Sequence, residues 1–226
     1  MRSLILFDCD GTLTDSNSLI VHAIRGAFTD MKLTAPSHSE ILQGLGMSLD
    51  GVLEGLLQRQ SEVSLADVDI QALAQAYREH YWAGESDIVL YPRVLETLDV
   101  LKQRGYWMGI VTGKSKAGLM RVFERFPLQD YILAWRTADC CPSKPHPAMA
   151  EECMQELGVD AAHTSLVGDA HFDIRMAKSA GIRSVGVAFG MESGQILLDE
   201  GAQAVVQTFD ALLDYFPNEQ GIKGQA

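Results

Sequence analysis

The sequence predicts an α/β protein, with a doubly wound parallel sheet and an α-helical domain inserted after its first strand. Short apolar runs alternate with helical patterns from about residue 88 onward, which is typical of parallel strands joined by helices. Between the first apolar run and that region, apolar residues recur only at helical spacing. The chain has 226 residues, 47% of them hydrophobic, which is enough for one large core with a smaller insert.

The first strand and the insert occupy the N-terminal part of the chain. Residues 4–7 form a short apolar run that ends in Asp8-Cys9-Asp10-Gly11, so we predict a buried strand followed by a turn. Helical patterns then cover residues 19–27, 37–46, 52–57 and 70–82. We therefore predict a helical cap domain of residues 16–86, inserted into a core of residues 1–15 and 87–226.

The remainder of the predicted core alternates helices and strands. The predicted strands are residues 107–112, 131–135, 165–168, 184–188 and 204–206. The predicted helices are residues 91–105, 115–126, 147–157 and 174–180. This order favours a Rossmann-like sheet covered on both faces, in which ligands sit beyond the carboxyl ends of the strands.

Composition excludes several classes of partner. The net charge of −12 disfavours nucleic acid and anionic membrane surfaces, since proteins that bind either need a basic face. No run approaches the roughly 20 apolar residues that span a bilayer. The four cysteines lack Cys-x-x-Cys or zinc-site spacing, which favours reduced thiols in a cytoplasmic protein. The sequence leaves a monomer and a homodimer open.

Asp8 and Asp10 stand one residue apart at the end of the first predicted strand. If the extended geometry lasts through Asp10, both carboxylates point the same way and Cys9 points into the core. Two carboxylates at a buried strand end repel each other and lose solvation, so a divalent cation is expected to compensate. The alternative is an ordinary Asp-Gly turn at the surface.

Three further polar clusters follow predicted strands or loops. Thr112-Gly113 follows the strand of residues 107–112, Lys144 lies in a proline-rich loop, and Asp169 and Asp173 follow the strand of residues 165–168. Because the carboxyl ends of parallel strands meet at one edge of a sheet, these groups are expected to meet the first two carboxylates.

In their order and placement, the four clusters resemble the motifs of haloacid-dehalogenase-type phosphohydrolases with a helical cap, especially the phosphoglycolate phosphatase-like branch. Residues 8–15 resemble the first motif, Thr112 the second, Lys144 the third, and Gly168-Asp169 with Asp173 the fourth. The resemblance implies Mg²⁺-dependent hydrolysis of a small, phosphoglycolate-like phosphate monoester through an aspartyl-phosphate. The expected partner is therefore a small phosphorylated metabolite.

The resemblance also implies roles for the acidic residues. Asp8 is the expected nucleophile, and Asp10 is expected to protonate the leaving group and then to activate water. Mg²⁺ is expected to bind the Asp8 carboxylate, the Asp10 backbone carbonyl and Asp169. Asp173 is expected to orient Lys144 or a metal-bound water.

The phosphoryl group has its own implied contacts. Thr112, Gly113 and Lys144 are expected to hold its oxygens, and Thr112 and Lys144 thereby act in catalysis. Structural alternatives exist, since Thr112 could cap the next helix, Lys144 could be a solvated loop lysine, and Asp173 could be an ordinary first-turn acid. Gly113 departs from the asparagine that is common in relatives, which removes one side-chain donor.

Other activities on the same scaffold remain open. They are a pyrophosphatase, a sugar-phosphate phosphatase or mutase and, with less support, a non-catalytic regulatory binder. Asp10 disfavours a dehalogenase, because true dehalogenases of the resembled family lack it. A phosphonate hydrolase would need a cap lysine, and Lys32 is the only lysine of the predicted cap. The apolar loop 44–48 favours a small substrate, and we expect Lys114 and His171 at the surface.

Overall fold

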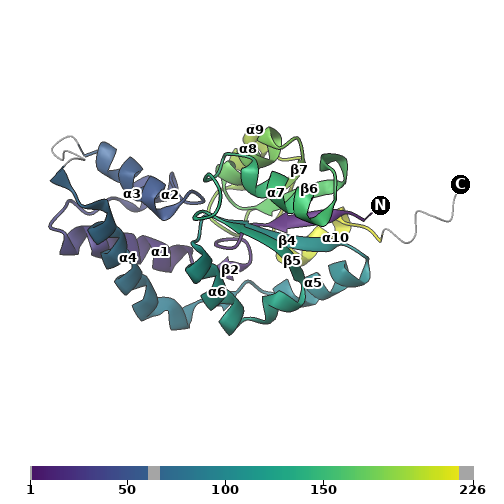
Figure 1. Ribbon diagram of the computed structural model, residues 1–226, viewed down its shortest axis with the longest axis horizontal. Helices are drawn as coiled ribbons and strands as arrows, with labels where there is room; N and C mark the ends of the chain where they lie inside the picture. The colour runs from purple at the N-terminus through teal and green to yellow at the C-terminus, as the bar shows by residue number, and fades with distance from the viewer. Residues whose placement is uncertain (1, 61–66, 219–226) are drawn as a thin grey trace, which may run out of the picture.

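A parallel sheet forms the centre of the protein (Figure 1). A computed structural model describes residues 2–60 and 67–218, and within these ranges the sheet has six strands in the order β5-β4-β1-β6-β7-β8. The strands are β1 (Leu4–Phe7), β4 (Trp107–Thr112), β5 (Ile132–Thr137), β6 (Thr164–Gly168), β7 (Arg183–Val187) and β8 (Ala204–Val206). The predicted α/β class with a helical insertion is confirmed.

The strand order places the first strand at the point where the winding of the sheet reverses. Strand β1 pairs with β4 on one side and with β6 on the other, so Phe7 lies beside both Ile110 and Val167. In doubly wound sheets, ligands bind in the crevice at this point, beyond the carboxyl ends of the strands. The polar segments that follow β1, β4 and β6 are therefore neighbours in space.

Helices cover both faces of the sheet, with α7 and α8 on one side and α5 and α6 on the other (Figure 1). The core helices are α5 (Val94–Gln103), α6 (Lys116–Arg125), α7 (Ala148–Leu157), α8 (His171–Ser179), α9 (Gly194–Glu200) and α10 (Leu212–Tyr215). Short 3₁₀ helices are η3 (Pro127–Asp130), η4 (Ala161–His163) and η5 (Phe209–Ala211). No helix within the described ranges is long and apolar enough to cross a membrane.

Side-chain alternation along β1 explains how one strand serves both layers. Ile5 and Phe7 pack in the cluster that contains α5 and α6 side chains, whereas Leu4 and Leu6 pack in the cluster that contains α7 and α8 side chains. Cys9 continues the first series and is fully buried, as the alternation predicts. Burial raises the pKa of the Cys9 thiol to about 12, so it stays protonated near neutral pH.

The insertion is a separate layer of helices with its own apolar core, seen at the left of Figure 1. Its helices are α1 (Asn17–Asp30), α2 (His38–Leu42), α3 (Leu49–Gln58) and α4 (Ile70–Gly84). Polar caps begin three of them, since the side chains of Ser37, Ser48 and Asp69 accept hydrogen bonds from first-turn amides. Phe28 and Leu53 are fully buried inside this layer.

The two connections between insertion and sheet run side by side. Strands β2 (Thr14–Asp15) and β3 (Val89–Leu90) pair antiparallel, and η2 (Glu85–Asp87) lies just before β3. Sequence patterns did not predict this pair, because two residues are too few to show alternation. The division into a cap of residues 16–86 and a core of residues 1–15 and 87–226 stays a prediction. Parts of both, residues 61–66 and 219–226, lie outside the described residues.

Most predicted elements match the structure, and the differences have local causes. Strands β4 and β8 have the predicted bounds. Helix α8 begins at His171, three residues before the predicted start, because the Asp173 carboxylate accepts a hydrogen bond from the Ala170 amide and supports an earlier first turn. Helices α9 and α10 were not predicted, and both are short, with seven and four residues.

Candidate active site

Three strand ends and one loop bring the predicted site residues together. Asp8 directly follows β1, Thr112 ends β4, and Asp169 follows β6. Lys144 comes from the loop before α7, and Asp173 from the first turn of α8. These five side chains are all buried, with at most 2% of any residue exposed. The burial of Lys144 excludes a solvated loop lysine, and the burial of Gly11 excludes an Asp-Gly turn at the surface.

Lys144 lies between two carboxylates. Its Nζ atom is 2.7 Å from Asp8 Oδ1 and 2.7 Å from Asp173 Oδ1. Burial opposes a charged ammonium group here, but the charges of Asp173 and Asp8 outweigh it and raise the pKa of Lys144. The lysine therefore stays protonated and holds the Asp8 side chain in place.

Asp8, Asp169 and Asp173 form a compact carboxylate cluster, with one oxygen of each within 4.8 Å of the others. Burial raises the pKa of Asp8 and of Asp169, and neighbouring carboxylates add to both shifts, whereas the charge of Lys144 opposes the shift of Asp8. Asp169 is itself held by Thr12 Oγ1 at 3.0 Å and by the Met191 amide at 2.9 Å.

The cluster fits a divalent cation. Three buried carboxylates face a single ammonium group, so negative charge is in excess. Asp8 Oδ1 is buried, and the Lys144 ammonium group 2.7 Å away is shared with Asp173 rather than given to Asp8 alone. A donor set of oxygens only is the set that Mg²⁺ and Ca²⁺ prefer.

Gly11 allows the first turn to approach this cluster. Its φ of +78° is in the left-handed region, and a Cβ atom there would lie 1.9 Å from Asp169 Oδ2. A side chain at this position would therefore collide with a carboxylate of the cluster.

Asp10 lies apart from the carboxylate cluster. Its Oδ1 atom accepts a hydrogen bond from Ser16 Oγ and lies 2.9 Å from Lys114 Nζ. The expectation that Lys114 lies at the surface was wrong, since only 9% of its side chain is exposed. His171 is also largely covered, with its ring nitrogen 2.6 Å from Glu192.

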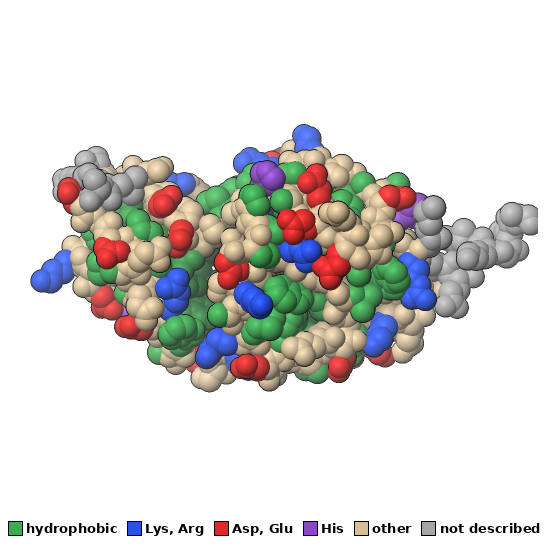
Figure 2. All heavy atoms as spheres, in the orientation of Figure 1, with side chains coloured by type: hydrophobic (Ala, Val, Ile, Leu, Met, Phe, Trp, Pro, Cys, Tyr) green, Lys and Arg blue, Asp and Glu red, His purple; other side chains and the backbone are tan. Residues whose placement is uncertain are grey.

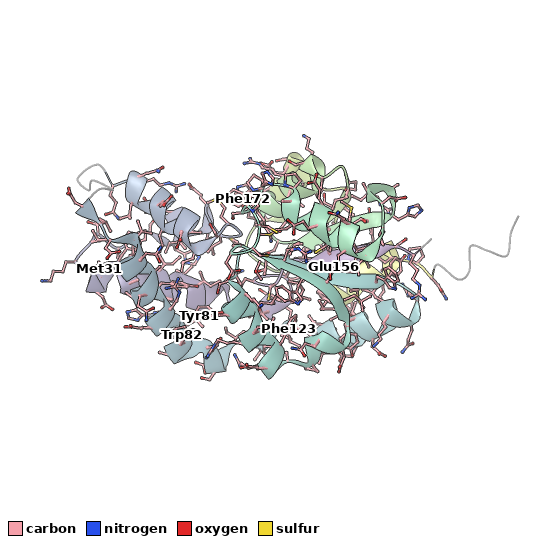
Figure 3. All side chains as sticks on the ribbon, in the orientation of Figure 1. Met31, Tyr81, Trp82, Phe123, Glu156 and Phe172 are labelled. Atoms are coloured by element: carbon pink, nitrogen blue, oxygen red, sulfur yellow. The ribbon has the colours of Figure 1, made fainter. Side chains whose placement is uncertain are left out.

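A cavity of about 340 Å³ lies between the insertion and the strand ends. Its floor contains Asp8, Asp10, Thr112 and Gly113. The insertion contributes three charged side chains, those of Asp50, Arg78 and Glu85. Its apolar and aromatic contributions are Ile20, Ile24, Leu45, Met47, Leu49, Val52, Tyr77, Tyr81 and Trp82. Figure 2 shows the two lobes meeting at a notch, and Figure 3 places Tyr81 and Trp82 on α4 beside that junction.

Thr112 does not cap the next helix, because Ser115 does so by accepting from the Gly118 amide. The Thr112 hydroxyl instead accepts from the Lys114 amide at 3.2 Å. Its own hydrogen therefore remains available to an acceptor in the cavity.

Gly113 lies directly under the loop that joins α2 to α3. A Cβ atom on Gly113 would lie 2.2 Å from the Met47 carbonyl oxygen and 2.9 Å from that of Gly46. The same loop is tied to the core through the Ser48 amide, which donates to Ser143 Oγ at 2.7 Å. Glycine at position 113 thus allows close packing of the insertion on the strand ends.

Comparison with known proteins decides the family. The pattern of the haloacid dehalogenase-like hydrolases matches residues 5–187. The chain belongs to this family. Within it, the hydrolase is 32% identical to the "probable phosphatase IndB" of Dickeya dadantii, over 94% of this chain and 93% of that protein.

Two further relatives support the assignment. A phosphoglycolate phosphatase of Vibrio parahaemolyticus is 31% identical to this hydrolase, over 93% of this chain and 94% of that protein. The crystal structure of a predicted phosphoglycolate phosphatase from Haemophilus somnus superposes with a TM-score of 0.84 at 26% identity, covering 96% of this chain and 98% of that one.

Sequence reasoning missed several residues at this site of the hydrolase. Ser16, Lys114 and Tyr81 surround Asp10, and the Met191 amide contacts Asp169. Lys114 had one available signal, because it stands two residues after Thr112 at a strand end. Tyr81 and Met191 had none, since each reaches the site only through tertiary packing.

Replacing Gly113 with alanine should loosen the insertion on the core, because the new methyl group would overlap the Met47 carbonyl. We expect faster amide hydrogen exchange in residues 44–49 of this variant than in wild type. Gly118→Ala is the matched control, since its Cβ would lie 3.5 Å from the nearest atom, an ordinary contact. Equal exchange in wild type and Gly113→Ala would contradict the packing described.

Proposed function

We propose that the hydrolase is a Mg²⁺-dependent phosphatase that cleaves small, phosphoglycolate-like phosphate monoesters through an aspartyl-phosphate. The observation that carries the proposal is the position of Asp8, which lines the cavity floor while Lys144 holds it from beneath. Asp10, two residues on, faces the same cavity. One carboxylate is thus placed to attack a substrate and the other to exchange a proton with it.

In the first step, a carboxylate oxygen of Asp8 forms a bond to phosphorus as the ester P–O bond breaks. Asp10 gives its proton to the departing oxygen, which leaves as an alcohol. In the second step, water attacks phosphorus and gives a proton to Asp10 while the Asp8–phosphorus bond breaks. Inorganic phosphate is released, and both aspartates return to their starting states.

The phosphoryl oxygens need donors that do not rearrange during these steps. The free hydroxyl hydrogen of Thr112, the Gly113 amide and the Lys144 ammonium group are the donors that we assign to them. Asp173 keeps Lys144 in position through its 2.7 Å contact.

Asp8, Asp169 and the backbone carbonyl of Asp10 would hold Mg²⁺, with Asp173 as a further carboxylate of the same cluster. When bound, the ion offsets the repulsion between the phosphate and the Asp8 carboxylate. Its charge also balances the excess of buried carboxylates, which Lys144 alone does not balance.

We assign residues 16–86 the role of a cap that excludes water from the phosphoenzyme. The position of the cavity between the insertion and the strand ends supports this role. The cavity volume of about 340 Å³ and the names of the relatives support a small phosphate ester as substrate. A pyrophosphatase, or a sugar-phosphate phosphatase or mutase, would use the same core residues.

Four free thiols are the basis for placing the protein in the cytoplasm.

The function is tested by assaying wild type and Asp8→Asn with Mg²⁺ on p-nitrophenyl phosphate, phosphoglycolate, sugar phosphates and nucleotides. We expect hydrolysis by wild type, highest kcat/KM for small monoesters, and a loss of about 1,000-fold or more in Asp8→Asn because the nucleophile is gone. Asp99→Asn, at an exposed position of α5, is the control. Equal rates in wild type and Asp8→Asn would rule out the mechanism, and a preference for nucleotides would rule out the substrate class.

Metal binding is tested by thermal unfolding at neutral pH. The folded-state pKa of Asp169 is raised, so its charged form destabilises the metal-free fold at neutral pH. Without Mg²⁺, Asp169→Asn should therefore melt at the same temperature as wild type or at a higher one. Saturating Mg²⁺ should raise the Tm of wild type and of Asp99→Asn but not that of Asp169→Asn. An equal Mg²⁺ shift in all three proteins would contradict the site.

A further inference from the structure

Lys114 is a buried ammonium group that the proposed mechanism does not use. Its Nζ atom lies 2.9 Å from Asp10 Oδ1 and donates a hydrogen bond to the Tyr81 hydroxyl at 2.8 Å. The same atom lies 4.9 Å from the centre of the Tyr81 ring, within cation–π distance. An unpaired buried ammonium is costly, so these contacts account for its stability in this position.

The contacts at Asp10 distinguish its two carboxylate oxygens. Ser16 and Lys114 both contact Oδ1. Oδ2 has no hydrogen-bond partner among the described residues, and 20% of the Asp10 side chain is exposed toward the cavity. One oxygen is therefore fixed and the other is left to exchange a proton with a substrate.

Tyr81 links the insertion to these core residues through its hydrogen bond with Lys114. It belongs to α4 of the insertion and is buried at the junction (Figure 3), whereas Lys114 follows β4 of the core. The Tyr81 hydroxyl can contact Lys114 only while α4 is packed against the strand ends. The chain of contacts from Tyr81 through Lys114 to Asp10 thus depends on the docked insertion.

We propose that Lys114 is a positioning residue for Asp10, and that Tyr81 makes this positioning depend on the docked cap. The inference rests on the proposed function, in which Asp10 protonates the leaving group. Lys114 keeps its own proton throughout. The proton that moves goes from Asp10 Oδ2 to the ester oxygen as the P–O bond breaks, and it returns from the attacking water in the second step.

This role has a consequence that depends on the leaving group. An alkoxide is a strong base and needs a proton as it departs, whereas a dinitrophenolate departs without one. In the first step, which kcat/KM reports, a misplaced Asp10 therefore slows the cleavage of alkyl phosphates and leaves activated aryl phosphates almost unaffected; the second step is common to both esters and affects kcat alone. A lysine that instead bound substrate directly would lower kcat/KM for both classes through a higher KM.

The experiment compares kcat/KM of wild type, Lys114→Met, Tyr81→Phe and Asp10→Asn on an alkyl phosphate and on 2,4-dinitrophenyl phosphate, with Mg²⁺. General acid catalysis contributes about 10²–10⁴-fold, so we expect Lys114→Met to lose about 10- to 100-fold on the alkyl ester and less than about 3-fold on the aryl ester. Asp10→Asn should show the same pattern, more strongly, and Tyr81→Phe more weakly. The matched control is Lys116→Met, an exposed lysine on the same segment that should match wild type.

Several results would overturn the inference. These are equal losses on both esters, a rise in KM alone, or no loss in Lys114→Met. Melting curves and the Mg²⁺-induced Tm shift establish that each variant is folded. If Lys114→Met does not fold, Lys114→Arg replaces it, because arginine keeps the charge but displaces the donor. This variant should likewise lose kcat/KM on the alkyl ester and not on the aryl ester. Absence of hydrolysis by wild type would instead count against the proposed function.

Discussion

The structure depends on a charge imbalance in its interior. Three carboxylates, from Asp8, Asp169 and Asp173, share a buried volume with one ammonium group, that of Lys144. Such a cluster destabilises a fold unless a further cation balances it. The sheet order, the glycine turn after β1 and the Met191 amide all serve to bring these groups together and to hold them. The fold thus holds together carboxylates that repel one another, and a bound divalent cation would relieve this repulsion.

The insertion completes the site from the opposite side. Its loop packs on Gly113, its Ser48 amide bonds to Ser143, and its Tyr81 hydroxyl meets Lys114. All three contacts reach core segments that follow a strand or precede a helix, and the proposed catalytic groups lie on the same segments. Docking of the insertion and the arrangement of the proposed catalytic groups therefore depend on the same contacts.

Periodicity and strand ends predicted much of this architecture. The apolar run of β4 is buried on both faces, so its bounds were readable, and the strand ends located Asp8, Thr112 and Asp169 at one edge. The burial of Lys114 was not predictable, because it depends on Tyr81, 33 residues away in another layer. Short elements such as α10 also escaped prediction, since four residues show no helical period. Contacts between layers leave no local pattern in a sequence.

In the proposed mechanism, Asp8 carries the phosphoryl group during turnover. The most direct measurement is to quench wild type with acid during hydrolysis of a small phosphate ester, reduce the protein with borohydride, and locate the modified residue by peptide mass spectrometry. An acyl-phosphate is reduced to an alcohol, so we expect homoserine at position 8. Reduction at another position, or none under conditions in which turnover is observed, would contradict it.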